Sequence, residues 1–238
     1  MALKKILRST SRYFGFEISR YQEPPISPLL SLNIDLLIDI GANTGQSAIQ
    51  ARHEGYTKKI LSFEPLLNAY ESLCKNSKED LEWSVFRRCA IGSQPSISTI
   101  NVAGNSGSSS ILEMLPRHIN AAPELQYCST QEIEIITLDS IFDEISKGHK
   151  SIFLKIDTQG YEHEVLAGSI NSLNKIKAVQ LELSTTPLYS AQHLYDYFFD
   201  FFKMNNYLLW GLTPGFSDPE TGELLQFDAL FVRPDLAI

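Results

Sequence analysis

An acidic strand end followed by a glycine turn is the first feature of the sequence that can bind a ligand. The segment LLIDIGANTGQS, residues 36–47, ends an apolar run with Asp39 and places Gly41 and Gly45 in a DxGxNxG spacing. Because glycine has no side chain, such a turn lets a ligand approach the backbone closely. The spacing is neither GxGxxG nor GxxxxGKS/T, which disfavours binding of dinucleotides and nucleoside triphosphates.

Charge at the expected strand ends narrows the ligand class. Asp39, Glu64 and Asp157 each lie at or near the end of an expected parallel strand, the edge where open α/β sheets bind ligands. Three carboxylates repel a pyrophosphate but suit a cation. S-adenosylmethionine is a cation without phosphate, and Glu64 lies 19 residues beyond Gly45, about the distance expected for a ribose-binding acid. The alternative is that Asp39 only satisfies backbone amides.

The stretch FLKIDTQGYEHEVLAG, residues 153–168, supplies the candidates for proton transfer. A hydroxyl acceptor is a poor nucleophile while protonated, so a nearby base should help methyl transfer. By position Asp157 is the first choice as base, and His163 is the second because histidine titrates near neutral pH. Alternatively, Asp157 only binds the cofactor or caps a helix beginning near Tyr161, and His163 is an exposed helical residue. Lys155 shares a strand face with Asp157 and could pair with it, which would favour a positioning role.

Metal and disulfide chemistry have little support. Asp157 and Glu182, at the ends of adjacent expected strands, could together hold Mg²⁺, but no third ligand is evident, so we expect no metal site. The remaining histidines show no ligand spacing. Three cysteines, which are Cys74, Cys89 and Cys128, lack a CxxC pair, so neither a disulfide framework nor a zinc site is indicated, and a reduced, cytoplasmic setting fits best.

Composition indicates a soluble globular chain with an acidic body. The 238 residues carry a net charge of -8, of which residues 1–20 contribute +4 through five basic residues and Glu17, leaving -12 on the remainder. An acidic body argues against nucleic-acid binding. No run of 18 apolar residues and no signal-peptide pattern occurs, so we expect no transmembrane segment.

The first 30 residues differ from the rest of the chain. Leu3, Ile6 and Leu7 alternate with basic residues, which predicts a short amphipathic helix within residues 1–20. We expect this helix to pack on its own domain, and the alternative is docking to a membrane surface or a partner. The segment EPPISP then breaks regular structure, so residues 1–30 are interpreted as a basic leader with a Pro-rich linker and residues 31–238 as one domain.

Strand-like and helix-like segments alternate through that domain. Strands are expected at 36–40, 58–65 and 83–92, with helices at 44–55 and 66–76 between them, which predicts a parallel, doubly wound sheet. Further strands are expected at 98–104, 131–139, 151–157, 178–184, 207–212 and 227–233, with a helix at 190–205 before the last two. The strands at 98–104 and 131–139 form an inserted excursion around AGNSGSSS, a loop that either closes over the acceptor or is solvated.

Five motifs in order resemble one known family. DIGANTG, SFEP, CAIG, ITLDS and LKIDTQGYEHEVLAG occur in the order seen in FkbM family methyltransferases, across residues 35–233. The resemblance implies a Rossmann-like class I methyltransferase fold with a mostly parallel seven-stranded core sheet and an inserted β excursion between the third and fourth core strands. It also implies S-adenosylmethionine as methyl donor and O-methylation of a hydroxyl, usually on a sugar or a natural product. The leader FGFEISRY resembles that of members associated with surface-polysaccharide synthesis.

The resemblance also implies residue roles by position. Asp157 would lie next to the methyl group, and Glu64 would bind the ribose. Ala90 and Ile91 would contact the adenine. The methionine part of the cofactor would be surrounded by Asp39, Gly41, Ala42, Asn43, Thr44 and Gly45. Many family members have glutamate where this sequence has Gln159, and an amide cannot accept a proton at neutral pH, so Gln159 is excluded as a base.

Several functions are therefore compared. The first is S-adenosylmethionine-dependent O-methylation of a sugar or glycoconjugate hydroxyl, with a polyketide-like natural product as the alternative acceptor. A nicotinamide-dependent nucleotide-sugar enzyme would need GxGxxG and a YxxxK-like pair, which the sequence lacks. The third possible function is that of a non-catalytic binding module. Either acceptor, a carbohydrate or another small molecule, would be selected by aromatic residues such as Tyr189 and Trp210, unless these belong to the core.

Overall fold

The computed structural model describes residues 27–234, and the leader helix expected in residues 1–20 lies outside them. The described chain opens with the short helix α2 (Pro28–Ser31), whose Leu29 packs in a core cluster with Leu37 and Phe153. Residues 28 and 29 therefore pack against the domain, although the sequence interpretation places them in the linker. The boundary at residue 31 itself stays a prediction.

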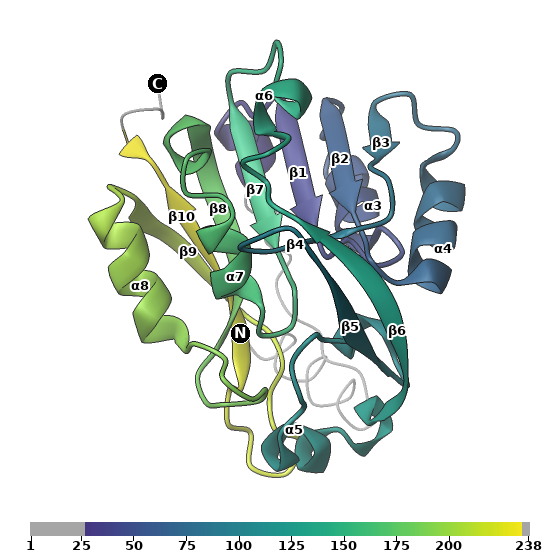
Figure 1. Cartoon of the computed structure of the whole chain (residues 1–238). Helices are drawn as coiled ribbons and strands as arrows, with labels where there is room; N and C mark the ends of the chain where they lie inside the picture. Colours follow the sequence, from purple (N-terminus) through teal and green to yellow (C-terminus); the bar gives the residue numbers. More distant parts are fainter. Residues whose placement is uncertain (1–26, 235–238) are drawn as a thin grey trace, which may run out of the picture.

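A seven-stranded sheet forms the centre of the molecule (Figure 1). Its spatial order is β3-β2-β1-β7-β8-β10-β9. The strands are β1 (Leu36–Ile40), β2 (Lys59–Phe63), β3 (Trp83–Val85), β7 (Ile152–Ile156), β8 (Ile176–Ser184), β9 (Leu208–Pro214) and β10 (Gln226–Val232). The first five strands of the order are parallel, and β10 pairs antiparallel with both β8 and β9. This arrangement confirms the expected Rossmann-like class I methyltransferase fold.

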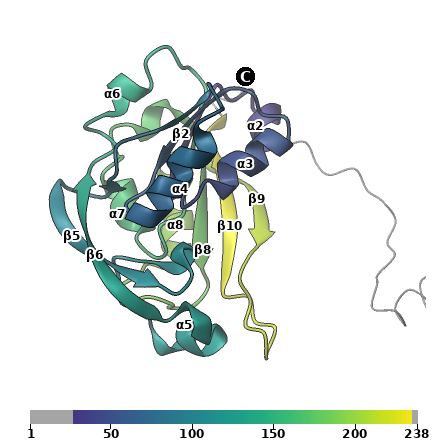
Figure 2. The ribbon, with the colours of Figure 1, turned by 90° about the vertical axis from the view of Figure 1, so that its right-hand side faces the viewer.

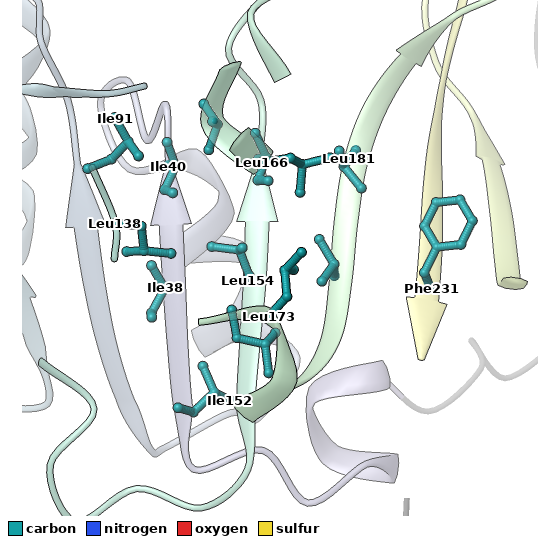
Figure 3. Packing of buried hydrophobic residues seen from close by; sticks show 14 of the residues in the cluster. Ile38, Ile40, Ile91, Leu138, Ile152, Leu154, Leu166, Leu173, Leu181 and Phe231 are labelled. Atoms are coloured by element: carbon teal, nitrogen blue, oxygen red, sulfur yellow. The ribbon is translucent and has the colours of Figure 1, made fainter. Parts of the chain in front are cut away.

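Helices cover both faces of this sheet, as Figure 2 shows with α2 and α3 on one side and α7 on the other. The helix α3 (Gln46–His53) buries Ala48 and Ala51 against β1 and β7, and α4 (Leu67–Ser77) buries Leu73 in the same cluster. The opposite face packs against α7 (Glu162–Ala167) and α8 (Tyr195–Met204). Figure 3 shows strand residues such as Leu154 and Leu181 beside Leu166 of α7. Alternating strand residues thus bury both faces.

A second, three-stranded sheet corresponds to the predicted excursion. Its order is β4-β6-β5, formed by β4 (Ala90–Ile91), β5 (Ser96–Ala103) and β6 (Tyr127–Ile136). β5 and β6 pair antiparallel, and β4 pairs parallel with β6. Between β5 and β6 lie the helix α5 (Pro116–Ala121) and two 3-10 turns (Ser106–Ser108 and Pro123–Leu125). The helix α6 (Phe142–Ile145) follows β6, and a third 3-10 turn (Leu173–Lys175) follows α7.

Two expected elements differ most clearly from those in the structure. The single strand predicted at 83–92 is wrong, because the chain leaves the main sheet after Val85 and enters the second sheet at Ala90. Arg88 in the connecting segment donates to the carbonyl of Pro65 at 2.9 Å, which fixes this change of sheet. The helix predicted from residue 190 begins at Tyr195, since Gln192 instead accepts the backbone amides of the preceding loop. Within residues 27–234 no helix is long and apolar enough to cross a membrane.

Candidate functional site

A cavity of about 230 Å³ opens where β1, β2 and β7 end. Its lining residues come from the three strand ends, the segment around β4 and the loop after β5. They are Ile40, Gly41, Ala42, Asn43, Gln46, Ser47, Phe63, Glu64, Pro65, Cys89, Ala90, Ile91, Ile100, Ser106, Gly107, Ser109, Ile111, Lys155, Asp157, Thr158, Gln159 and Tyr161. Seven of the predicted site residues therefore meet at one cavity: Gly41, Ala42, Asn43, Glu64, Ala90, Ile91 and Asp157.

The turn after β1 brings bare backbone to this cavity. Gly41 has φ of +78°, and a Cβ there would lie 1.9 Å from the carbonyl oxygen of Asp157. No other residue type fits this position without moving β1 or β7. Asn43 also has a positive φ, of 49°, and its side-chain oxygen accepts a hydrogen bond from Ser106 at 3.1 Å. The glycine is thus required by the close packing of two strand ends.

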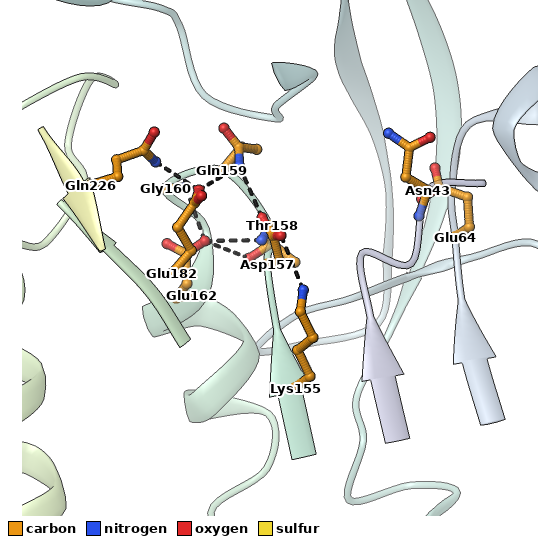
Figure 4. Close-up of polar contacts among 10 residues, drawn as sticks. All are labelled: Asn43, Glu64, Lys155, Asp157, Thr158, Gln159, Gly160, Glu162, Glu182 and Gln226. Carbon is orange, nitrogen blue, oxygen red and sulfur yellow. Dashed lines mark hydrogen bonds and ion pairs between the residues drawn. The ribbon is translucent and has the colours of Figure 1, made fainter. Parts of the chain in front are cut away.

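Glu64, at the end of β2, supports the same turn. Its Oε2 accepts the backbone amide of Asn43 and its Oε1 that of Leu66, both at 2.8 Å. The carboxyl group is buried, and this burial raises its pKa to about 7, although the two amides act in the opposite direction. Figure 4 shows Glu64 directly beside Asn43. A carboxylate oxygen can accept more than one hydrogen bond, so Glu64 can still receive a ribose hydroxyl.

Asp157, at the end of β7, is fixed by two donors on opposite sides (Figure 4). Lys155 donates to Oδ2 at 3.1 Å, as the sequence suggested, and Gln159 donates to Oδ1 at 2.9 Å. The same amide nitrogen of Gln159 donates to Glu182 at 2.6 Å, while its oxygen accepts the hydroxyl of Tyr189 at 2.7 Å. Gln159 therefore has a defined position, which links the end of β7 to that of β8.

Glu162 is a buried acid that the sequence interpretation missed. Its Oε1 accepts the amides of Thr158 and Gly160, at 3.0 and 3.1 Å, and the Thr158 hydroxyl at 3.2 Å. Helix α7 begins at Glu162 with no side-chain cap, so Glu162 rather than Asp157 satisfies the amides of this turn. The local sequence gives no sign of this burial, and only the turn geometry shows that Glu162 points inward. Burial raises the pKa of Glu162 to about 7.

That raised pKa predicts a pH-dependent loss of stability. Glu162 keeps its proton in the folded state up to about pH 7, whereas the unfolded group ionises near its ordinary value of 4.5. The contribution of Glu162 to the free energy of unfolding should therefore be greatest below pH 4.5 and fall by up to about 3 kcal/mol as the pH rises to 7. Glu162→Gln, which keeps an acceptor oxygen, should flatten this fall in urea unfolding curves recorded from pH 5 to 8. The exposed Glu132→Gln is the control, and equal curves for both variants would contradict the assignment.

The remaining cofactor candidates lie just outside the cavity wall. Asp39 is fully buried in β1, and neither carboxylate oxygen has a hydrogen-bond partner within the described chain. Burial raises its pKa to about 6, against the attraction of Lys155, its neighbour on β7. Gly45 is the N-cap of α3, and a Cβ there would meet the ring of Trp83 at 2.5 Å. Asp39, Thr44 and Gly45 thus do not line the cavity, and contact with the cofactor stays a prediction for them.

The loop AGNSGSSS forms one side of the cavity at the ends of β1, β2 and β7. Ser106, Gly107 and Ser109 line it, and Ser110 donates to the carbonyl of Gln159 at 2.7 Å. The side chain of Asn105 accepts the Gly107 amide at 3.0 Å and so shapes the turn. This loop therefore contacts both the turn after β1 and the turn after β7.

Three residues expected at the site lie elsewhere. His163 lines neither described cavity; its ring contacts His193 at a centroid distance of 4.5 Å, and its Nε2 lies 3.2 Å from Glu164. Burial lowers the pKa of His163, with a further contribution from His193. Tyr189 is fully buried behind Gln159, and Trp210 is 57% exposed on the edge strand β9. Neither aromatic residue lines the cavity, so the suggestion that they select the acceptor gains no support.

A metal site is not formed by the residues described. Asp157 and Glu182 do lie close together, but the amide of Gln159 bridges them. Across residues 27–234 no group of three potential ligands is positioned to hold a metal ion. The bridging amide instead explains how two carboxylates remain adjacent.

The chemistry of the cavity fits S-adenosylmethionine. Asp157 supplies negative charge, and Glu64 adds to it in its ionised form. Lys155, which is held by Asp157, is the one cationic side chain in the lining. Apolar side chains of Phe63, Ile91 and others offer a surface for a flat base. A cavity with this charge suits a sulfonium compound and disfavours a pyrophosphate.

Comparisons with known proteins agree with this assignment. The family model described as "Methyltransferase FkbM domain" matches residues 39–209, a narrower span than residues 35–233. No curated protein matches the chain. A putative S-adenosylmethionine-dependent methyltransferase from Listeria monocytogenes is similar at 7% identity and a TM-score of 0.49, with 87% of this chain and 94% of that chain covered.

Two further solved structures are similar at the level of fold. A putative tRNA (m1A22) methyltransferase from Streptococcus pneumoniae in complex with S-adenosylmethionine has 10% identity and a TM-score of 0.47, covering 86% of this chain and 70% of that one. A putative RNA methyltransferase from Pyrococcus horikoshii has 12% identity and a TM-score of 0.44, covering 98% and 99%. Such distant likenesses assign no activity here, and the assignment rests on the family match. The chain belongs to the FkbM methyltransferase family, and its methyl donor is S-adenosylmethionine.

Proposed function

We propose that this methyltransferase transfers the methyl group of S-adenosylmethionine to a hydroxyl of a sugar or glycoconjugate. The observation that supports it best is Asp157, which faces the cofactor cavity with its carboxylate fixed between Lys155 and Gln159. A carboxylate held in this way is a suitable acceptor for a neutral hydroxyl. The acidic body of the chain, -12 beyond residue 20, disfavours a polyanionic acceptor such as RNA.

The residues of the cavity would act mainly by binding and alignment. When bound, S-adenosylmethionine supplies an activated methyl group on a sulfonium. The turn from Gly41 to Asn43 would provide backbone contacts for its methionine part, and Glu64 would accept the ribose hydroxyls. Asp157 would orient the acceptor hydroxyl, and correct orientation alone can contribute several orders of magnitude in rate.

The geometry favours a positioning role for Asp157 over that of a base. Both of its oxygens already accept hydrogen bonds from fixed donors, Lys155 and Gln159. His163, the second candidate base, lies beside His193 and outside the cavity lining. We therefore propose that the hydroxyl proton passes to solvent water rather than to a histidine, while Asp157 would orient the hydroxyl oxygen for methyl transfer.

Asp157→Asn should keep the fold and lose most turnover. The amide keeps the size of the side chain but loses the charge and one acceptor, so the rate should fall by about a hundredfold or more. The assay is NMR of ¹³C-methyl S-adenosylmethionine mixed with a panel of sugars and nucleotide sugars, in which an O-methyl ether has its own carbon shift. The exposed Asp143→Asn is the matched control. Near-normal turnover of Asp157→Asn would show that Asp157 takes no part in catalysis.

The same assay separates the remaining acceptors. Methylation of polyketide-like hydroxyl compounds but of no sugar would favour the natural-product alternative. Cofactor binding without methylation of either class would favour a non-catalytic module. The family match argues against the nicotinamide-dependent enzyme. A place in cytoplasmic polysaccharide synthesis is proposed from the FGFEISRY motif, which lies outside the described residues.

A further inference from the structure

A buried tyrosine, Tyr189, contacts the turn that follows β7. It lies in the loop before α8, and its backbone amide donates to the side chain of Gln192 at 2.8 Å. Its ring packs on Gly160, where an added Cβ would lie 3.0 Å from the ring, and its hydroxyl donates to Oε1 of Gln159 at 2.7 Å. Tyr189 lines neither the cavity at the ends of β1, β2 and β7 nor a second cavity, of about 430 Å³, beside α3. It therefore supports the turn after β7 from behind the cavity wall.

The hydroxyl of Tyr189 determines which way the amide of Gln159 faces. The nitrogen of that amide carries two hydrogens, and it donates to Asp157 at 2.9 Å and to Glu182 at 2.6 Å (Figure 4). Burial raises the pKa of Tyr189 well above its ordinary value, so the hydroxyl keeps its proton and remains a donor. Its other acceptor, the carbonyl of Ser108, lies 3.5 Å away, which is long for such a bond. Only one orientation of the amide satisfies these groups, because a rotated amide would place its oxygen against two carboxyl groups.

The backbone of Gln159 has an unusual conformation. Its φ is +55°, in the left-handed region that residues with a side chain rarely adopt. Its carbonyl accepts the hydroxyl of Ser110 at 2.7 Å, so the backbone and the side chain are both fixed by distant parts of the chain. Strain of this kind persists where the surroundings over-determine a conformation, which occurs most often at functional sites. Here the side chain of Gln159 reaches back to Asp157, two residues earlier.

The amide of Gln159 separates two acidic groups. Asp157 and Glu182 follow or end the neighbouring strands β7 and β8, and one nitrogen donates to both. Burial raises the pKa of Glu182 well above its ordinary value, and the nearby Asp157 raises it further. Without the amide, Asp157 would keep only Lys155 as a side-chain donor, at Oδ2, and its carboxylate could turn away from Glu182.

We propose that Gln159 is a positioning residue for methyl transfer, and that the hydroxyl of Tyr189 sets the direction of its amide. The amide fixes Oδ1 of Asp157 while Lys155 fixes Oδ2, so the carboxylate has one orientation at the cavity. Gln159 and Tyr189 act on the methyl acceptor only through Asp157. This inference rests on the proposed role of Asp157 in orienting the acceptor hydroxyl.

Tyr189→Phe tests the orientation of the amide without any methyl acceptor. The variant keeps the ring on Gly160 and removes the hydroxyl that faces Oε1. In ¹H–¹⁵N NMR spectra the side-chain amide of Gln159 should exchange its hydrogens with water at least about tenfold faster in this variant, because the amide can then turn. Tyr207→Phe is the matched control, since this buried tyrosine has its hydroxyl 2.8 Å from the carbonyl of Ile176, away from the site. Equal exchange in the wild type and both variants would overturn the proposal.

Turnover tests the link to Asp157, in the ¹³C-methyl assay with whichever compound of the panel the wild type methylates. Tyr189→Phe should lower kcat by about tenfold, because the acceptor is less well aligned. Its dissociation constant for S-adenosylmethionine should stay within about twofold of the wild-type value, since Tyr189 does not line the cavity. Full kcat in Tyr189→Phe, or the same loss in Tyr207→Phe, would contradict the positioning role. A wild type that methylates no compound would instead contradict the proposed function, and the amide exchange rates would then decide this inference.

Gln159→Glu adds a pH profile as a readout. The new carboxyl group can donate to Asp157 only while it holds its proton, and burial with two neighbouring acids should raise its pKa. The ratio of its kcat to that of the wild type should therefore be highest at about pH 5.5 and fall about tenfold by about pH 8, as the group ionises and repels Asp157. A ratio that is constant across this range would refute the role of the amide. If Gln159→Glu does not fold, Tyr189→Phe alone decides.

Discussion

Gly41→Ala is expected to abolish cofactor binding and to destabilise the domain. The new Cβ would lie 1.9 Å from the carbonyl oxygen of Asp157, so the ends of β1 and β7 must separate. The positive φ of +78° adds strain of about 1–2 kcal/mol. We expect a total loss of about 3–5 kcal/mol in the free energy of unfolding, measured in urea.

Gly148→Ala separates the two causes of that loss. Gly148 has a similar φ, of +87°, but a Cβ there meets nothing within 4 Å. The free energy of unfolding of the Gly148→Ala protein should therefore fall by about 1–2 kcal/mol, the cost of the backbone conformation alone. This variant should bind S-adenosylmethionine normally. If Gly41→Ala were no less stable than Gly148→Ala, the close approach of the two strand ends would be refuted.

Glu64→Ala is expected to weaken S-adenosylmethionine binding by about a hundredfold or more, since hydrogen bonds to a charged group contribute about 1.5–3 kcal/mol each. The variant removes the expected ribose acceptor, and it also leaves the amides of Asn43 and Leu66 without the oxygens they now bind. The measurement is the dissociation constant from calorimetric titration.

Two matched variants make this result specific. Glu64→Gln retains one acceptor oxygen, so its loss of affinity should be intermediate, about tenfold. The exposed Glu79→Ala removes the same charge from the surface and should leave the dissociation constant unchanged. An unchanged constant for Glu64→Ala itself would refute the ribose assignment.

Much of the site follows from local sequence patterns. One sheet edge is expected to hold Asp39, Glu64 and Asp157, because each ends a strand of a parallel sheet. Two of the three, Glu64 and Asp157, line the cavity. Asp39 does not, since it is fully buried within β1, where Lys155 of β7 is its neighbour. The periodicity of the sequence predicts where a strand ends. How deeply one side chain is buried at that end depends instead on the packing of its neighbours.

Contacts between distant segments were harder to predict. No glycine or proline marks the point after Val85 at which the chain leaves the main sheet. In this segment Arg88 donates a hydrogen bond to the carbonyl of Pro65, which is a contact between distant parts of the chain. The inward direction of Glu162 depends on the positive φ of Gln159 and Gly160, which turns two amides toward its carboxylate. His163 was chosen for its titration range, whereas its neighbour His193 comes from a loop 30 residues later. Contacts of this kind, between residues far apart in the chain, leave no pattern in the local sequence.

Calorimetric titration of the full chain with S-adenosylmethionine, S-adenosylhomocysteine and NAD tests the central claim most directly. A cavity formed by bare backbone at Gly41 and carboxylates at Glu64 and Asp157 should bind one molecule of either sulfur compound per chain and no NAD. Binding of NAD alone, or of none of the three, would contradict the account.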